Sequence, residues 1–246
     1  MYEIEQDVMS DAFRACWSAA GNHLNRQVEG GIQSWLRAHP HPPYLEHLSF
    51  RLGNQLFYVR IDDVDGQVQG PGTPDGFITA AAGTNGVPCV LPMRQLIGGQ
   101  WVAALPGWGL LEADGRTPLD PVARVTDQKI EMTPWELQDM AVQVVCGALR
   151  RDWLQLMSWQ ANPQVDPSIW FIGHSGGPEW AVVRAARYPQ RSAARPANWE
   201  DIAEGCSQLS PVGHFASVGI VSAAQPFEAD DEAPVPLWRG HGMHVR

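Results

Sequence analysis

A chain of 246 residues that is 44% hydrophobic and holds 11 tryptophans is long and apolar enough to bury one large core or two smaller ones, which excludes a disordered protein. Its formal net charge of −10 argues against a protein built to bind the phosphate backbone of nucleic acid, because that function needs a basic face. The N-terminus is acidic and lacks the apolar core of a signal peptide, and no apolar run is long enough to span a bilayer. We therefore expect a cytoplasmic protein with no membrane segment.

The cysteines give no sign of a metal centre or of a disulfide framework. Short CxxC spacings are typical of structural zinc sites, and a high density of cysteine is typical of small secreted scaffolds. Neither pattern describes the four cysteines of this chain, which are Cys16, Cys89, Cys146 and Cys206. We expect four reduced thiols.

The first half of the chain predicts a mixed α+β unit. In chain order we expect a helix at residues 7–36 that is broken near Gly30-Gly31, strands at 47–52 and 55–61, a helix at 73–83, and strands at 87–93 and 100–105. The turn Gly53-Asn54 between the first two strands is typical of a hairpin. Thr73-Pro74 begins the second helix, because threonine is a good N-cap and proline suits the first helical position.

A segment rich in Gly, Pro and Asp separates the two halves. Residues 106–130 have this composition, which is typical of linkers, so we expect an N-terminal half at 1–105 and a C-terminal half at 131–246. In the second half we expect a helix that begins at residue 133, strands at 154–159, 169–172 and 180–188, a helix at 198–209, a strand at 214–223, and a solvated tail from residue 228.

The helix that begins at Thr133 has the strongest local signal in the chain. Thr133-Pro134-Trp135-Glu136 combines a capping box with proline at the first helical position. Apolar residues then recur at helical spacing on one face, at Leu137, Ala141, Val144, Val145 and Ala148.

The two halves resemble each other in the order of their elements. The second half has the order αβββαβ, and the first has αββαβ with one extra strand. In each half, the second strand of a hairpin contains a Val-Arg pair, at Val59-Arg60 and Val183-Arg184. We therefore predict an α+β fold that arose by internal duplication, with the first half as the more diverged copy.

Gly173-His174-Ser175-Gly176-Gly177-Pro178 resembles an active site and has three interpretations. Gly173-x-Ser175-x-Gly177 after an apolar strand resembles the nucleophile elbow of α/β-hydrolases, which implies a serine hydrolase with Ser175 as the nucleophile. The segment from Ser175 to Pro178 is also similar to the nucleophile segment of trypsin-like proteases. In the third interpretation, the glycines form a hairpin loop and Ser175 has no chemical role.

A serine nucleophile also needs a base and an acid that orients it. The hydrolase interpretation takes His241 as the base. The other downstream histidines are His214 and His244, and the possible orienting acids are Asp230 and Asp231. The strands at 154–159 and 169–172 are joined by a segment too short for the crossover helix of a parallel sheet, which favours the hairpin interpretation. The trypsin-like interpretation lacks its base, because Ala80-Ala81-Ala82 stands where that family has Ala-Ala-His.

The order of helix, three strands, helix and strand over residues 133–225 resembles the core of the PD-(D/E)xK restriction-endonuclease-like superfamily. In that family, acids on the first helix, the second strand and the third strand bind a divalent metal and activate water. The resemblance implies that Glu136, Asp166 and Glu179 would be the catalytic residues, with Asp166 and Glu179 as the ligands of Mg²⁺.

The lysine of that family's motif is missing. Ala181 stands two residues after Glu179, where the family has lysine, and Lys129, the only lysine, precedes the first helix. Arg184 faces the opposite side of the strand from Glu179, because side chains alternate along a strand. We therefore expect a degenerate and inactive site.

Several acidic residues also have a structural interpretation. Glu136 completes the capping box, Asp166 precedes a proline in a turn, and Glu179 borders a loop. Asp62-Asp63-Val64-Asp65-Gly66 resembles the start of a calcium-binding loop but lacks the downstream glutamate, so we expect a solvated turn.

The leading hypothesis is a non-catalytic protein that binds an unidentified protein partner, with a homo-oligomer as one option. Nucleic acid is disfavoured by the charge, and no cofactor is needed. Two alternatives stay open: a serine hydrolase that uses Ser175, and a divalent-metal-dependent nuclease that would need Mg²⁺, with Arg184 as a displaced basic residue.

Overall fold

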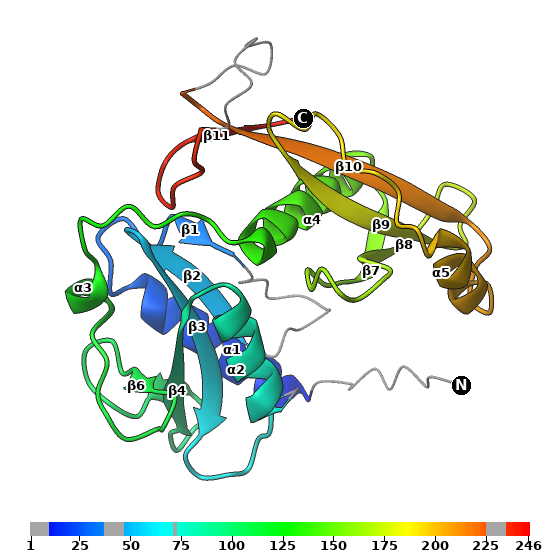
Figure 1. Ribbon diagram of the computed structural model, residues 1–246. Helices are drawn as coiled ribbons and strands as arrows, with labels where there is room; N and C mark the ends of the chain where they lie inside the picture. Colours follow the sequence, from blue (N-terminus) through cyan, green and yellow to red (C-terminus); the bar gives the residue numbers. More distant parts are fainter. Residues whose placement is uncertain (1–9, 37–46, 71–72, 225–234) are drawn as a thin grey trace. The chain divides into compact units, whose positions relative to one another are not determined.

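The chain forms two compact units, Met1–Gln128 and Lys129–Arg246. The computed structural model describes residues 10–36, 47–70, 73–224 and 235–246, and both units are mixed α+β structures (Figure 1). None of the helices in these ranges combines the length and the apolar character needed to cross a membrane.

The first unit is a mixed sheet with one helix on each face. Its elements are α1 (Asp11–Asn25), β1 (Ser34–Trp35), β2 (Leu48–Leu52), β3 (Gln55–Asp63), α2 (Pro74–Gly83), β4 (Val87–Gln95), β5 (Trp101–Ala103), β6 (Leu111–Glu112) and α3 (Pro121–Arg124). The strand order is β1-β2-β3-β4-β5, and β6 pairs with β4. The helix α2 connects the parallel strands β3 and β4, whereas the other neighbouring strands are antiparallel.

The second unit is a sheet of five strands. Its elements are α4 (Pro134–Arg151), β7 (Gln155–Trp159), β8 (Ile169–Ile172), β9 (Pro178–Arg187), α5 (Trp199–Cys206), β10 (Gly213–Ser222) and β11 (Met243–Val245). The strand order is β7-β8-β9-β10-β11. Only β9 and β10 are parallel, and α5 connects them.

The two sheets share one topology. In both units a long helix is followed by two antiparallel pairings, one parallel pairing through a crossover helix, and one further antiparallel pairing, and in the first unit β6 adds one more antiparallel pairing to β4. The Val-Arg pairs that the sequence singles out lie at matching places. Val59 packs in the core that contains residues of α1, and Val183 packs in the core that contains residues of α4. Because side chains alternate along a strand, Arg60 and Arg184 each lie on the face of the strand that points away from that core.

The strand β9 divides the second unit into two cores, because its side chains alternate between the faces of the sheet. Ala181 and Val183 pack in the core that includes the apolar face of α4. Trp180 and Val182 pack with Cys206 of α5 on the opposite face. The indole of Trp180 extends over β10 at Gly213, where a Cβ would lie only 2.1 Å from the ring.

The structure corrects the expected first helix. α1 ends at Asn25 instead of residue 36, and Gly30 and Gly31 follow with positive φ angles of 74° and 81°. The Asn25 side chain accepts a hydrogen bond from the backbone N–H of Ile32 at 2.8 Å, which stabilises this turn. The chain then continues as the short strand β1, which the sequence did not predict.

The expected linker is also corrected. Most of residues 106–130 belong to the first unit, because Leu110 and Leu119 are buried in its core and β6 pairs with β4. The Asn54 side chain donates hydrogen bonds to Thr126 Oγ1 at 2.8 Å and to the carbonyl of Gln128 at 2.7 Å. The boundary between the units therefore falls between Gln128 and Lys129.

The end of the chain is less solvated than the sequence predicts. The strand β11 pairs with the end of β10, and Leu237 and Arg239 are buried. The acidic residues Asp230 and Asp231 lie outside the described residues.

Candidate functional site

Glu136 lies in the first turn of α4 and is bound by two groups that fix its position. Its Oε2 accepts a hydrogen bond from the Thr133 backbone N–H at 2.8 Å, which completes the predicted capping box. Arg239 donates to both carboxylate oxygens, at 2.8 Å from Nε and 3.0 Å from Nη2. Both side chains are buried, so the two charges compensate each other away from water. The role of Glu136 in this structure is to cap a helix and to hold Arg239.

Asp166 forms a two-point ion pair with Arg184. The guanidinium donates from Nη1 to Oδ1 at 2.9 Å and from Nη2 to Oδ2 at 2.5 Å, and both side chains are largely buried. Arg184 Nη1 also donates to the carbonyl of Val183 at 2.9 Å. Asp166 therefore fastens the loop between β7 and β8 to β9, and it lies before β8 instead of on it.

Glu179 pairs with His214 on the neighbouring strand. Oε2 of Glu179 lies 2.7 Å from Nε2 of His214, and the imidazole packs against Phe171 with ring centroids 5.7 Å apart. The carboxylate also lies against Gly173 at the base of the hairpin loop, where a Cβ would meet Oε1 at 1.7 Å. The pair holds the imidazole in one orientation, and a histidine held in this way can act as a base only if a nucleophile lies within hydrogen-bond reach.

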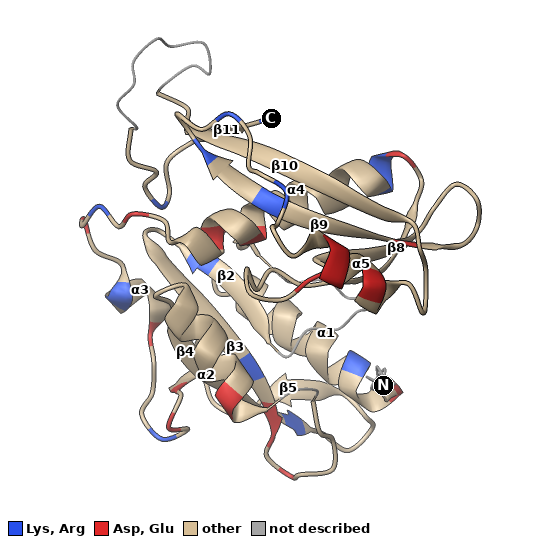
Figure 2. Ribbon diagram, turned by 45° about the vertical axis from the view of Figure 1, so that its right-hand side comes forward, with Lys and Arg blue, Asp and Glu red and all other residues tan. Residues whose placement is uncertain are grey.

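The three acids do not converge on one metal site. Glu179 shares the face of β9 that carries Ala181 and Val183, whereas Arg184 and the Asp166 bound to it lie on the opposite face. That opposite face also carries α5 with its acidic first turn (Figure 2). Across the residues that the structure describes, no group of three or more His, Cys, Asp or Glu side chains is arranged to hold a metal ion. The predicted pair of metal ligands, Asp166 and Glu179, is therefore not assembled.

Ser175 lies in the hairpin loop between β8 and β9. The loop is closed by hydrogen bonds from Gly173 N–H to the Gly177 carbonyl and from Gly176 N–H to the Gly173 carbonyl, both at 2.9 Å. A nucleophile elbow needs a helix after the serine, but residues 178–187 form the strand β9. The elbow interpretation is therefore corrected to a hairpin.

The predicted base of the hydrolase lies far from Ser175. The loop that carries Ser175 precedes the first residue of β9, beside the start of β10. His241 lies just before β11, which pairs with the last residues of β10. The two residues are therefore at opposite ends of the sheet. Within the described part of the chain, Ser175 makes no side-chain hydrogen bond to any histidine.

The four cysteines are free and buried, as the sequence predicts. Burial raises the pKa of Cys16 and of Cys146 to about 12 and the pKa of Cys206 to about 11, and it raises the pKa of Cys89 further still. A thiol with such a pKa stays protonated near neutral pH and is a poor nucleophile and metal ligand. These side chains serve packing.

The segment that resembles a calcium loop is a turn, as predicted. The carboxylate of Asp63 accepts hydrogen bonds from the backbone N–H groups of Asp65, Gln67 and Val68, at 2.8–3.0 Å. These bonds hold the segment as a turn.

Two residues that matter in the structure were not singled out from the sequence. Arg239 is the partner of Glu136 across 103 positions, and no local pattern indicates such a contact. Trp153 follows α4 with a positive φ of 61° and is 94% exposed. A tryptophan after a helix gives no sequence signal for this backbone conformation, because glycine is the usual residue there.

The comparisons with known proteins add one finding. Neither a curated protein nor a solved structure matches the chain. Residues 135–246, which make up nearly the whole second unit, match a family described as a "Domain of unknown function (DUF8840)".

Proposed function

We propose that this protein binds a partner protein and has no catalytic activity, and that its second unit is a degenerate version of the restriction-endonuclease-like fold. The element order α4-β7-β8-β9-α5-β10 supports the likeness, together with the parallel pairing of β9 and β10 through α5. The acidic net charge of −10 supports a partner other than nucleic acid.

One observation carries the non-catalytic part of the proposal. Each acid that the nuclease likeness would place in the active site is bound to a basic side chain, and the pairs lie apart: Glu136 with Arg239, Asp166 with Arg184, and Glu179 with His214. A metal ion would have to displace Arg184 from Asp166, and Glu179, the second ligand of the nuclease likeness, lies on the other face of the sheet. Ala181, which replaces the lysine of the family's motif, is buried in the apolar core.

A nuclease assay tests this part of the proposal. The full-length protein is incubated with single-stranded and double-stranded DNA and RNA in the presence of Mg²⁺ or Mn²⁺. We expect no cleavage above that of a mock preparation. Metal-dependent cleavage that is lost in Asp166→Asn, while circular dichroism shows the variant to be folded, would overturn the proposal.

A labelling assay tests the hydrolase alternative. A fluorophosphonate probe reacts with activated serines, and we expect no labelling of the native protein, because no histidine among the described residues forms a hydrogen bond with Ser175. Labelling that disappears in Ser175→Ala and persists in Ser192→Ala, a control serine elsewhere in the second unit, would instead identify a serine hydrolase.

The binding part of the proposal needs a positive test. The tagged protein is purified from the organism that encodes it, and proteins that co-purify in stoichiometric amounts are identified. We expect one of them to form the same complex when both components are purified separately and mixed. If no co-purified protein can be reconstituted into a complex, the proposal fails.

We also propose that the two units are diverged copies of one ancestral unit. Their shared strand order and the matching faces of Val59-Arg60 and Val183-Arg184 support this origin. Each copy would then be a self-sufficient fold. We expect residues 129–246 expressed alone to unfold in one cooperative transition in urea, monitored by tryptophan fluorescence.

A further inference from the structure

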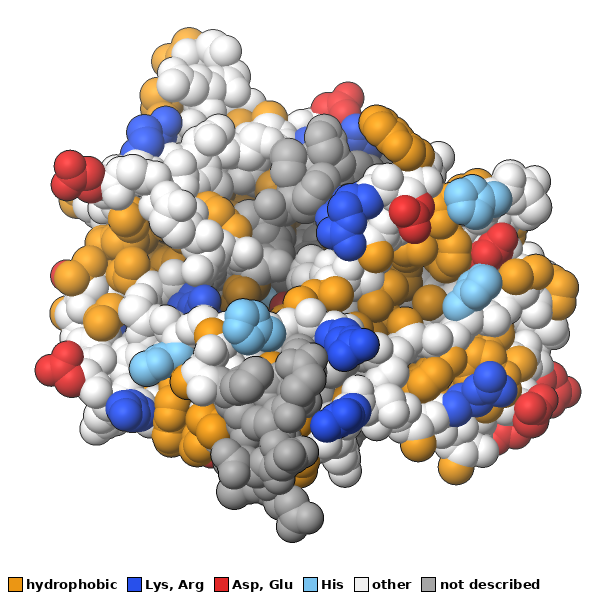
Figure 3. Space-filling model, turned by 90° about the horizontal axis from the view of Figure 1, so that it is seen from above, with side chains coloured by type: hydrophobic (Ala, Val, Ile, Leu, Met, Phe, Trp, Pro, Cys, Tyr) orange, Lys and Arg blue, Asp and Glu red, His pale blue; other side chains and the backbone are white. Residues whose placement is uncertain are grey.

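Trp153 differs from every other tryptophan of the protein. All eleven lie in the described residues, and Trp153 is the one that is exposed, whereas the other ten are buried or partly buried. Apolar side chains reach the surface elsewhere as well (Figure 3), and scattered ones are ordinary. A tryptophan this exposed is not ordinary, because the residue carries a large apolar surface and is enriched among the anchors of protein interfaces.

The backbone at Trp153 is held in a conformation that suits glycine. The N–H of Trp153 donates to the Arg150 carbonyl at 3.1 Å, and the N–H of Leu154 donates to the Leu149 carbonyl at 3.0 Å. These two bonds form the Schellman motif that ends α4, and they place Trp153 at the position where glycine is usual. A bulky side chain with a φ of 61° is strained there, and strain of this kind marks functional positions.

Trp153 stands next to β7, the last strand in the order of the second unit's sheet. β7 begins two residues later, at Gln155, and among the strands that the structure describes it pairs with β8 alone. The outer backbone N–H and C=O groups of an edge strand can pair with an additional strand from another chain. An aromatic anchor and the edge strand of the sheet therefore adjoin each other.

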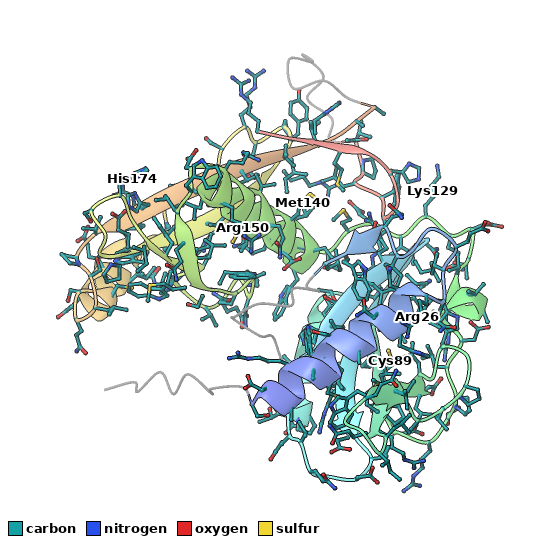
Figure 4. All side chains as sticks on the ribbon, turned by 180° about the vertical axis from the view of Figure 1, so that it is seen from behind. Arg26, Cys89, Lys129, Met140, Arg150 and His174 are labelled. Atoms are coloured by element: carbon teal, nitrogen blue, oxygen red, sulfur yellow. The ribbon has the colours of Figure 1, made fainter. Side chains whose placement is uncertain are left out.

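The charge beside this edge favours an acidic partner. Arg150, which Figure 4 labels, and Arg151 are exposed at the end of α4. The Arg150 guanidinium lies over the ring of Trp159, the last residue of β7, at 5.2 Å from the ring centroid. Asp152 lies between these arginines and Trp153, so the three charged residues of this segment have a net charge of +1, whereas the whole chain has a net charge of −10. A second copy of the chain would bring the same arginines together, which disfavours self-association through this edge.

We propose that Trp153 and the outer edge of β7 bind an acidic segment of the partner protein in an extended conformation, as a sixth strand of the second unit's sheet. Main-chain hydrogen bonds to β7 hold the segment, Trp153 packs against one of its apolar side chains, and Arg150 and Arg151 contact its carboxylates. This inference rests on the proposed binding function and names the surface and the partner's chemistry.

The test uses peptides of defined chemistry. The probe is a fluorescein-labelled nonapeptide that alternates glutamate and valine, and its binding to the full-length protein is measured by fluorescence anisotropy. Two control peptides replace every glutamate by lysine or carry N-methyl groups on alternate backbone amides, which removes their capacity to pair as a strand. We expect the glutamate peptide to bind and both controls to bind at least roughly tenfold more weakly.

Two protein variants complete the test. Trp153→Gly removes the anchor but suits the local backbone, so the variant will fold, and we expect affinity for the glutamate peptide to fall roughly tenfold. Ile97→Ser removes an equally exposed apolar side chain from the first unit and leaves affinity unchanged. The inference is overturned if the wild-type protein does not bind the probe, if either control peptide binds equally well, or if Trp153→Gly has no effect.

Failure here is distinguishable from failure of the proposed function. If a reconstituted partner binds Trp153→Gly as tightly as the wild-type protein, the binding function stands and the surface is elsewhere. Metal-dependent nuclease activity or specific labelling of Ser175 would instead remove the binding function itself.

Discussion

Arg239 and Glu136 form a buried ion pair that ties the C-terminal segment of the chain to the first turn of α4, with Nε 2.8 Å from Oε1. The pair compensates two charges that would otherwise be costly to bury. The same carboxylate caps the helix, so one side chain serves both the local and the long-range structure.

Removing the arginine should therefore destabilise the second unit strongly. We expect Arg239→Met to lower the free energy of unfolding by about 3–5 kcal/mol, because Glu136 is left buried without a counter-charge. Urea denaturation measures the change. Arg187→Ala is the control, since Arg187 pairs with Glu131 at a more exposed position and its loss should cost less than about 1 kcal/mol. Equal effects of the two substitutions would contradict this account of Glu136.

The pair of Asp166 and Arg184 should contribute a measurable coupling energy. In a double-mutant cycle of Asp166→Asn and Arg184→Gln, we expect a coupling of about 2 kcal/mol from urea denaturation, because the pair is largely buried and has two hydrogen bonds. The same cycle on Arg60 and Asp62, an exposed pair, should give less than about 1 kcal/mol. A coupling near zero at Asp166 would leave this carboxylate available for another role.

Trp153→Gly should make the protein more stable. Relief of the left-handed backbone strain should raise the free energy of unfolding by about 1 kcal/mol, because glycine adopts this conformation without a steric cost. Thermal or urea denaturation measures the gain. Asn85→Gly is the matched control: Asn85 has a φ of 49°, but asparagine tolerates this region, so the change should stay within about 0.5 kcal/mol. A loss of stability in Trp153→Gly would show that the indole supports the fold.

The cysteines should be inert in the native protein. With Ellman's reagent at pH 8, we expect slow labelling of the folded chain and rapid labelling of four thiols in guanidinium chloride. Cys206 should react first among them, because burial and the neighbouring charge of Asp166 raise its pKa only to about 11. Rapid reaction of Cys146, whose pKa burial raises to about 12, would show that the core of the second unit opens readily.

Features encoded by neighbouring residues were predictable from the sequence. The capping box from Thr133 to Glu136 and the hairpin at Gly53-Asn54 depend on positions only a few residues apart, and the structure confirms both. The linker prediction was wrong because a composition rich in Gly, Pro and Asp hid two apolar residues, Leu110 and Leu119, which the core of the first unit buries.

The candidate site depended on long-range information that the sequence does not display. Whether Ser175 was a nucleophile turned on whether residues 178–187 were strand or helix, and a run of Ala, Val and Arg suits both. The neutralisation of Asp166 and Glu136 depends on Arg184 and Arg239, which lie 18 and 103 positions away. That Glu179 and Arg184 lie on opposite faces of β9 was predictable, because successive side chains of a strand point to alternate faces and these two residues are an odd number of positions apart.

The distance between Glu136 and Arg239 along the sequence also has a consequence for biosynthesis. While the chain emerges from the ribosome, α4 is made long before its counter-ion, so its first turn must keep a carboxylate in water until Arg239 arrives. The first unit ends at Gln128, so it is fully translated before α4 and can fold while the rest is still being made. The second unit closes late, and until then the apolar face of α4 is left without the sheet that covers it.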